Sequence, residues 1–271
     1  MSGVDATTVC RLLSVSRSGY YKHREKEDKK VLKEMVEMLF KKHKGNCGKR
    51  PIKAELQSVY GVKASLPEIS GILKEKGLVA KGGRKKKRKY PVPTKEEYIA
   101  ANLVEDKYSA TAFGDIYCAD ITEIRCKSGK AYISGIIDVA SRLVVAFNVR
   151  TTAKKELIHE SITAAIGRYG KCQIFHSDRG TQYTALKTKK LLEDSGIKQS
   201  MSRPGRPNDN QPIESFWKTL KRELDGLSEL SFKEVKQEIF QYIELYYNTE
   251  RLHSALGYIT PAHARRNLSA S

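Results

Sequence analysis

The chain has 271 residues, which predicts about two domains, each long enough to bury a core of its own. Hydrophobic residues make up 39% of the sequence, and its apolar stretches are far shorter than the ~20 residues that cross a membrane. These features exclude a small disulfide-framework protein and a membrane-spanning protein. The 50 basic and 31 acidic side chains give a net charge of +19, which favours a polyanionic partner.

The positive charge is concentrated in the first third of the chain. Residues 1–95 contain 25 basic and 9 acidic side chains, a net charge of +16. Residues 96–271 contain 25 basic and 22 acidic side chains, a net charge of +3. This asymmetry predicts a nucleic-acid-binding segment that precedes a nearly neutral body.

The five cysteines follow no metal-binding or disulfide pattern. Their number is odd, no two of them form a Cys-x-x-Cys pair, and no histidine pair has zinc-finger spacing. We interpret them as reduced thiols. Because the first residues lack the basic start and apolar run of a secretory signal, we expect a cytoplasmic protein.

The first residues predict two short helices around a turn, over residues 6–13 and 14–21. Ser16 is positioned to cap the second helix. In a helix-turn-helix unit this second helix would place Arg17 against DNA. An ordinary helical hairpin fits the same pattern equally well.

A second helical unit follows. Apolar residues at helical spacing predict a long amphipathic helix over residues 29–44, and two shorter helices are expected over 51–60 and 66–76, separated by Gly61. Ser65 and Glu68 have the spacing of a capping box. Lys49 and Arg50 belong to the basic residues that make this unit a second candidate for DNA binding.

Six consecutive basic residues come next and are followed by a Tyr-Pro-Val-Pro sequence. Like charges repel and proline interrupts helices and strands, so this segment is expected to be a linker. It is either a solvated tether or a clamp on DNA phosphates. The six residues are Arg84, Lys85, Lys86, Lys87, Arg88 and Lys89.

The remaining sequence predicts an α/β body, with a mixed sheet flanked by helices. Three β-rich segments come first, and helices and strands then alternate. We expect strands at residues 115–125, 131–140, 142–150, 172–177 and 197–201, and helices at 153–168, 183–194, from 212 onward and at 232–248.

Three carboxylates stand where folding alone does not require them. Asp120 interrupts the first strand, where a buried charge is costly, and Asp178 ends an apolar strand at the edge where α/β sheets place ligands. Glu214 lies in the first turn of a helix, and Lys218 and Lys221 lie within about 60° of it on the same face. Ordinary ion pairing on the helix surface also explains that last group.

Thirty-five residues separate Asp178 from Glu214. With Asp120, this set resembles the D,D-35-E catalytic core of retroviral integrases and bacterial insertion-sequence transposases. The neighbouring sequences are similar to the transposases: His-Ser-Asp-Arg-Gly-Thr-Gln-Tyr at 176–183, Ile-Glu-Ser-Phe-Trp-Lys-Thr-Leu-Lys at 213–221, and a C-terminal signature from 247 to 261. Residues 14–21 resemble the paired helix-turn-helix region of OrfB-type transposases, so the likeness covers essentially the whole chain.

The sequence departs from the family pattern at three places. Tyr117 stands where tryptophan is usual, and residues 205–211 read Gly-Arg-Pro-Asn-Asp-Asn-Gln instead of Gly-Asn-x-Tyr-Asp-Asn-Ala. The His-His-Cys-Cys zinc domain of retroviral integrases is missing from the sequence. The first two differences keep the three carboxylates, and the third favours the bacterial branch.

The resemblance implies a ribonuclease-H-like core preceded by a helical DNA-binding region, and a DNA transposase that cuts and joins strands at element ends. It implies two Mg²⁺ or Mn²⁺ ions, with Asp120 binding both and Asp178 and Glu214 binding one each, and water or a 3′-hydroxyl as nucleophile. Lys218 and Lys221 would hold the DNA end. The alternatives are a catalytically inactive DNA-binding relative and a nuclease of the same fold.

The resemblance also implies partners and a division of the chain. The partners are double-stranded DNA, further copies of the chain in the complex that joins two DNA ends, and an upstream reading-frame product or frameshift fusion. The location would be the bacterial cytoplasm, with the nucleoid. The expected divisions are a DNA-binding region at 1–80, a linker at 81–107, a catalytic core at 108–230, and a C-terminal helix and tail at 231–271.

Three further polar residues have more than one interpretation. His176 is more typical of a core histidine than of a catalytic one, and Asp209 of a turn or cap residue than of a metal ligand. Arg251 either binds DNA or docks the last helices on the core. The sequence favours neither role for Arg251.

Overall fold

The computed structural model describes residues 7, 10, 11, 14–81, 98–104, 110–203 and 207–269. The chain forms two compact units, Met1–Lys81 and Gly82–Ser271. Among the helices that the structure describes, none is both long and apolar enough to cross a membrane.

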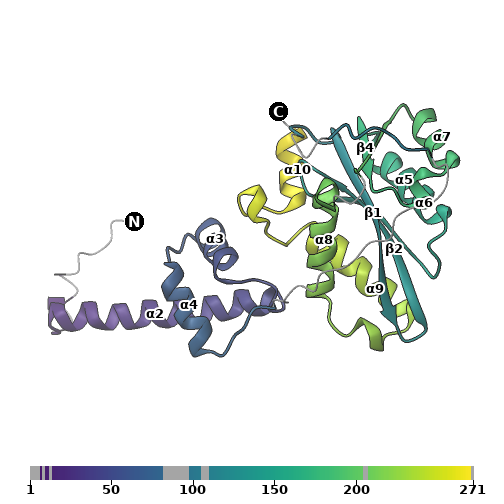
Figure 1. Cartoon of the computed structure of the whole chain (residues 1–271). Coiled ribbons are helices and arrows are strands. Elements are labelled where there is room, and N and C mark those ends of the chain that lie inside the picture. The colour runs from purple at the N-terminus through teal and green to yellow at the C-terminus, as the bar shows by residue number, and fades with distance from the viewer. Residues whose placement is uncertain are drawn as a thin grey trace. The chain divides into compact units, whose positions relative to one another are not determined.

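The first unit is built on one long helix, α2, which spans Arg17–Lys42 (Figure 1). The side chain of Ser16 accepts a hydrogen bond from the Gly19 amide at 3.0 Å, as its predicted capping role requires. The expected break after residue 21 is wrong, because the lysines and glutamates that follow favour helix and continue it into the predicted amphipathic segment. The predicted helix at 6–13 lies mostly outside the described residues.

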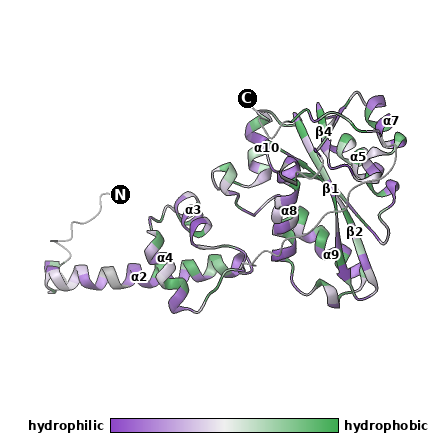
Figure 2. Cartoon of the chain, in the orientation of Figure 1, coloured by the Kyte–Doolittle hydropathy of each residue, from purple (hydrophilic) through white to green (hydrophobic). Residues whose placement is uncertain are grey.

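Among the described residues of α2, the buried side chains belong to its second half. Val36 and Leu39 are fully buried, whereas the described side chains from Arg17 to Lys30 are almost all exposed. Figure 2 shows this difference as a hydrophilic or neutral first half of the helix. The long helix therefore projects beyond the core that anchors it.

Two shorter helices complete that core. They are α3, Lys49–Tyr60, and α4, Leu66–Glu75. Gly61 ends α3 with a φ of 65°, a left-handed conformation that glycine adopts without strain. The capping box is confirmed: the Glu68 amide donates to the Ser65 hydroxyl, and the Ser65 amide donates to the Glu68 carboxylate at 2.8 Å.

The second unit contains a five-stranded mixed sheet, as predicted, with the strand order β3-β2-β1-β4-β5. β1 pairs antiparallel with β2, and β2 with β3, whereas β1, β4 and β5 run parallel. The strands are β1 Ile116–Cys126, β2 Gly129–Asp138, β3 Val144–Arg150, β4 Ile174–Ser177 and β5 Lys198–Met201.

Helices cover both faces of this sheet (Figure 1). In β1, Ile116 and Cys118 point to a cluster that includes residues of α8, Gln211–Glu223, and α9, Phe232–Phe240. Tyr117 and Ala119 point to a second cluster with residues of α5, Lys155–Tyr169, and α7, Leu186–Asp194. The alternation along β1 thus assigns even positions to the α8 face.

Two predicted helices differ in detail from the structure. The segment expected as one helix at 183–194 is α6, Thr181–Thr184, followed by α7, with extended backbone at Ala185 between them. The segment expected at 232–248 begins as α9 and continues as the π-helix η3, Gln241–Tyr247. The remaining short elements are η1 Pro207–Asn210, η2 Leu227–Glu229, η4 Ser254–Leu256 and α10 Pro261–Ser269.

All five cysteines are buried and free of disulfide bonds. Burial raises the pKa of the Cys172 thiol to about 12. Buried cysteines without disulfide bonds agree with the interpretation of reduced thiols.

Candidate active site

Asp120 lies on the face of β1 that α8 covers, two residues after Cys118 on the same side of the strand. Its partner across the antiparallel pair is Gly135 of β2. A carboxylate in the middle of a paired strand contributes nothing to a hydrophobic core, so its position indicates a polar function.

Asp178 follows the last residue of β4, next to β1 in the sheet. The Gly180 amide donates a hydrogen bond to Asp178 Oδ1 at 2.9 Å, which orients the carboxylate. Because β1 and β4 are parallel neighbours, Asp178 lies close to Asp120 although 57 residues separate them in the sequence.

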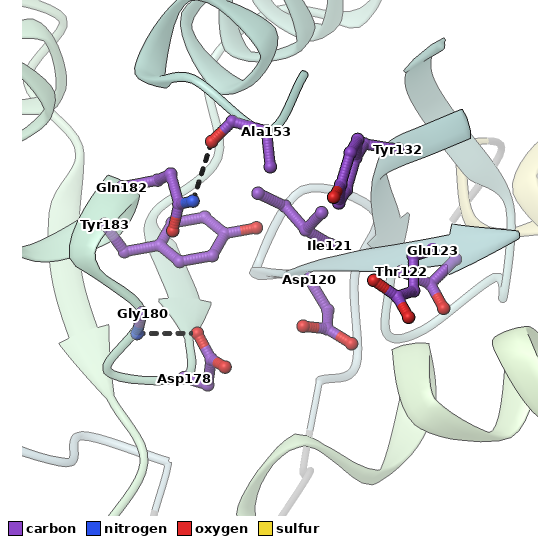
Figure 3. A pocket seen from close by; sticks show the side chains of 10 residues that line it. All are labelled: Asp120, Ile121, Thr122, Glu123, Tyr132, Ala153, Asp178, Gly180, Gln182 and Tyr183. Carbon is purple, nitrogen blue, oxygen red and sulfur yellow. Dashed lines mark hydrogen bonds between the residues drawn. The ribbon is translucent and has the colours of Figure 1, made fainter. Parts of the chain in front are cut away.

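Asp120 and Asp178 line one open pocket of about 230 Å³. Figure 3 shows both carboxylates on the same side of this pocket and the ring of Tyr183 extending from the α6 side toward β1. The other lining residues are Ile121, Thr122, Glu123, Tyr132, Ala153, Gly180, Gln182 and Tyr183.

The pKa of Asp120 is raised to about 8. Burial is the largest cause, and the charges of Asp178 and Glu214 add to it. Burial also raises the pKa of Asp178. Acidic groups that are desolvated together in a pocket are typical of catalytic and metal-binding sites, because a bound cation offsets their repulsion.

Glu214 does not line the pocket. It lies in the first turn of α8, after Pro212, and accepts a hydrogen bond from Lys218 at 3.2 Å. Its charge nevertheless contributes to the raised pKa of Asp120. In the part of the chain that the structure describes, no three carboxylate, histidine or thiol side chains gather closely enough to hold a metal ion.

The basic residues expected to bind DNA fall in three groups. Lys218 and Lys221 are exposed on α8, as the helix periodicity predicts. Arg17 begins α2, and Lys49 and Arg50 begin α3, all three exposed in the first unit. The basic run Arg84, Lys85, Lys86, Lys87, Arg88 and Lys89 lies outside the described residues.

His176 and Asp209 are structural residues, in agreement with the favoured interpretations. The buried His176 ring is within hydrogen-bond distance of the Ser200 and Ser202 hydroxyls, at 2.9 and 3.2 Å. Asp209 is buried and accepts hydrogen bonds from the backbone and guanidinium groups of Arg203 and from Asn102. Asp209 thereby fastens the chain just before α8.

Arg251 docks the C-terminal segment on the core. Its guanidinium contacts the buried carboxylate of Glu223 at the end of α8. Of the two roles that the sequence left open, the structure favours this one.

Two aromatic residues near Asp120 were missed by the sequence reasoning. The buried hydroxyl of Tyr183 and the buried indole N–H of Trp217 have no hydrogen-bond partner in the described part of the chain. Tyr183 follows Asp178 by five residues and Trp217 follows Glu214 by three, so proximity to the acidic motifs was the signal available. That both groups are buried beside Asp120 required the folded chain.

Comparisons with known proteins find integrase and transposase relatives. Family models described as "Integrase core domain" match residues 110–207 and 195–261. The transposase for insertion sequence element IS904 of Lactococcus lactis is 35% identical over 88% of this chain and 94% of its own length. Transposase InsF for insertion sequence IS3A of Escherichia coli is 28% identical over 93% of this chain and 91% of its own length.

Among solved structures, the catalytic core domain of HTLV-2 integrase in complex with magnesium is 16% identical. The match covers 56% of this chain and 95% of the integrase domain, with a TM-score of 0.42.

Proposed function

We propose, on the basis that the chain belongs to the OrfB-type insertion-sequence transposases and carries an integrase core domain, that Asp120, Asp178 and Glu214 are its catalytic residues. The chain is a DNA transposase, an enzyme of the DDE transposase and integrase class.

One observation carries the proposal: two carboxylates from neighbouring parallel strands line one pocket, and the pKa of Asp120 is raised to about 8. Such a desolvated acidic pair retains a proton near neutral pH unless a bound cation compensates its charge. The pair therefore fits a divalent metal, and oxygen ligands of this kind suit Mg²⁺ or Mn²⁺. Glu214 accepts a hydrogen bond from Lys218, and it would release this partner when it binds a metal ion.

The side chains hold and orient the reacting groups. When bound, two Mg²⁺ or Mn²⁺ ions would stabilise negative charge on the transferring phosphate and activate the attacking oxygen. Asp120, Asp178 and Glu214 would bind these ions, and none of the three attacks phosphorus. The nucleophile is water or a DNA 3′-hydroxyl. Lys218 and Lys221 would hold the DNA end beside the site through phosphate contacts.

The DNA-binding surfaces and partners form a second part of the proposal. Residues 1–80 would bind the element ends through Arg17, Lys49 and Arg50, and the basic run at 84–89 would contact DNA phosphates. Joining two DNA ends requires more than one copy of the chain, and an upstream reading-frame product would supply further end recognition. We place this complex on nucleoid DNA in the bacterial cytoplasm.

A strand-transfer assay tests the catalytic assignment. Labelled duplexes that carry the terminal repeats of the element are incubated with the full chain in Mg²⁺, with and without a chelator. We expect joined products from wild type, and none from Asp120→Asn, Glu214→Gln or chelated samples. Glu229→Gln, a substitution of an exposed acidic residue of η2, is the matched control and should behave as wild type.

The other outcomes are also informative. Joined products from Asp120→Asn would refute the catalytic assignment. Cleavage without joining by wild type would contradict the strand-transfer part and favour a nuclease of the same fold.

A further inference from the structure

The single tryptophan of the chain, Trp217, packs directly against the backbone of β2 at Gly135. A Cβ atom built on Gly135 would lie 2.7 Å from ring carbons Cη2 and Cζ2 of Trp217, closer than real Cβ contacts allow. The indole ring therefore occupies the space that any larger residue at position 135 would need. Trp217 is 5% exposed, so this contact is part of the core.

This contact places Trp217 beside Asp120. Gly135 is the cross-strand partner of Asp120, and directly opposed residues of antiparallel strands project from the same face of the sheet. That face is the one covered by α8, which carries Trp217. The tryptophan fills the vacant side-chain position next to the Asp120 carboxylate.

The electrostatics agree with this placement. Burial is the largest cause of the raised pKa of Asp120, and hydrogen bonding by the Trp217 side chain is among the smaller effects that lower it. The buried indole N–H has no hydrogen-bond partner within hydrogen-bond distance and angle in the described part of the chain. A buried donor is stabilised by an acceptor on the same face of the sheet, and the Asp120 carboxylate lies on that face.

Trp217 also lies on the same helix as Glu214. Residues three apart in a helix are neighbours on its surface, so Glu214 and Trp217 move together with the first turns of α8. The contact between the Trp217 ring and Gly135 therefore sets the distance between Glu214 and Asp120. Ile213 supports the same contact, since its Cδ1 lies 3.5 Å from the Cβ position of Gly135.

We infer that Trp217 is a positioning residue for the acidic site: its ring packs α8 onto β2 at Gly135, and its indole N–H donates to the Asp120 carboxylate. This pair of contacts fixes the separation of Asp120 and Glu214. The inference rests on the proposed function, in which these two carboxylates bind the metal ions.

The first experiment measures Mn²⁺ binding to the full chain by the electron paramagnetic resonance signal of free Mn²⁺. Trp217→Phe retains an aromatic ring but removes the N–H. We expect its Mn²⁺ dissociation constant to rise about 10-fold, as for other residues that orient metal ligands. Its strand-transfer rate should fall at limiting Mn²⁺, while its DNA affinity stays at the wild-type level.

Gly135→Ala tests the ring contact independently, because the added methyl group displaces the indole. We expect weaker Mn²⁺ binding here as well. Gly167→Ala in α5 is the matched control, since a Cβ at Gly167 meets no atom within 4 Å. It should bind Mn²⁺ as wild type does.

A second readout uses the fluorescence of Trp217, which is the only tryptophan emission of the chain. Paramagnetic Mn²⁺ should quench it in wild type and not in Asp120→Asn. Wild-type Mn²⁺ affinity in both Trp217→Phe and Gly135→Ala, with Asp120→Asn inactive and unable to bind Mn²⁺, would overturn this inference alone. If Asp120→Asn binds Mn²⁺ and joins DNA normally, the proposed function fails and this inference with it.

Discussion

Arg251 donates from Nη2 to Glu223 Oε1 at 2.9 Å and from Nε to both carboxylate oxygens, at 3.2 and 3.1 Å. The Glu223 side chain is fully buried, and it also accepts a hydrogen bond from the Tyr242 hydroxyl at 2.8 Å. Glu223 belongs to the last turn of α8, nine residues after Glu214. The ion pair thus ties the C-terminal segment to the helix that carries a proposed catalytic residue.

Removing one member of this pair should destabilise the second unit. Glu223→Ala leaves the guanidinium of Arg251 without its carboxylate, and breaking a buried ion pair costs about 3 kcal/mol. We expect this loss in the free energy of unfolding measured with urea. Glu223→Leu with Arg251→Met removes both charges and should recover part of it. Equal losses in the single and double variants would contradict the pairing argument.

Acid should destabilise the protein through His253. Burial, with the charges of Arg251 and Arg142, lowers the pKa of His253 from 6.5 to about 3. The unfolded chain therefore binds a proton below pH 6.5 that the folded chain does not bind until about pH 3. The stability that the neutral imidazole contributes is complete above pH 6.5 and is lost as the pH falls toward 3.

Between pH 7 and pH 5 this effect amounts to about 2 kcal/mol of unfolding free energy. Urea unfolding at the two pH values measures it. The glutamine in His253→Gln does not titrate. Between pH 7 and pH 5 this variant should therefore lose about 2 kcal/mol less unfolding free energy than wild type. The same pH dependence in both proteins would show that His253 is not responsible.

The first unit should contribute salt-dependent DNA affinity. Lys49→Gln with Arg50→Gln removes two exposed charges at the start of α3, which lowers the number of phosphates neutralised. We expect weaker binding to element ends and a decrease of about 2 in the slope of log K against log salt concentration. Lys236→Gln, an exposed position of α9, is the control and should leave the slope unchanged.

The hydroxyl of Tyr183 should contribute nothing to folding stability. It is buried without a hydrogen-bond partner in the described part of the chain, so Tyr183→Phe removes an unfavourable burial. We expect the free energy of unfolding to stay the same or rise by about 1 kcal/mol. Tyr242→Phe is the matched comparison, because its hydroxyl donates to Glu223, and it should lose about 2 kcal/mol.

Local sequence patterns predicted much of both units. The Ser65–Glu68 capping box, the helix break at Gly61 and the order of strands and helices all depend on neighbouring residues, and the structure confirms them. The family relationship was likewise readable from the spacing of acidic motifs. The expected break in α2 was wrong because the lysines and glutamates after residue 21 favour helix and continue it.

By itself, the sequence determined the fold class, the relationship to insertion-sequence transposases and the three candidate carboxylates, because these depend on residue types and their spacing. Only the tertiary structure decided which groups meet: Trp217 with Gly135 and Asp120, and Arg251 with Glu223. The physical reason is that desolvation and close packing arise between segments far apart in the chain. An orphaned indole N–H or a raised pKa exists only once those segments have come together.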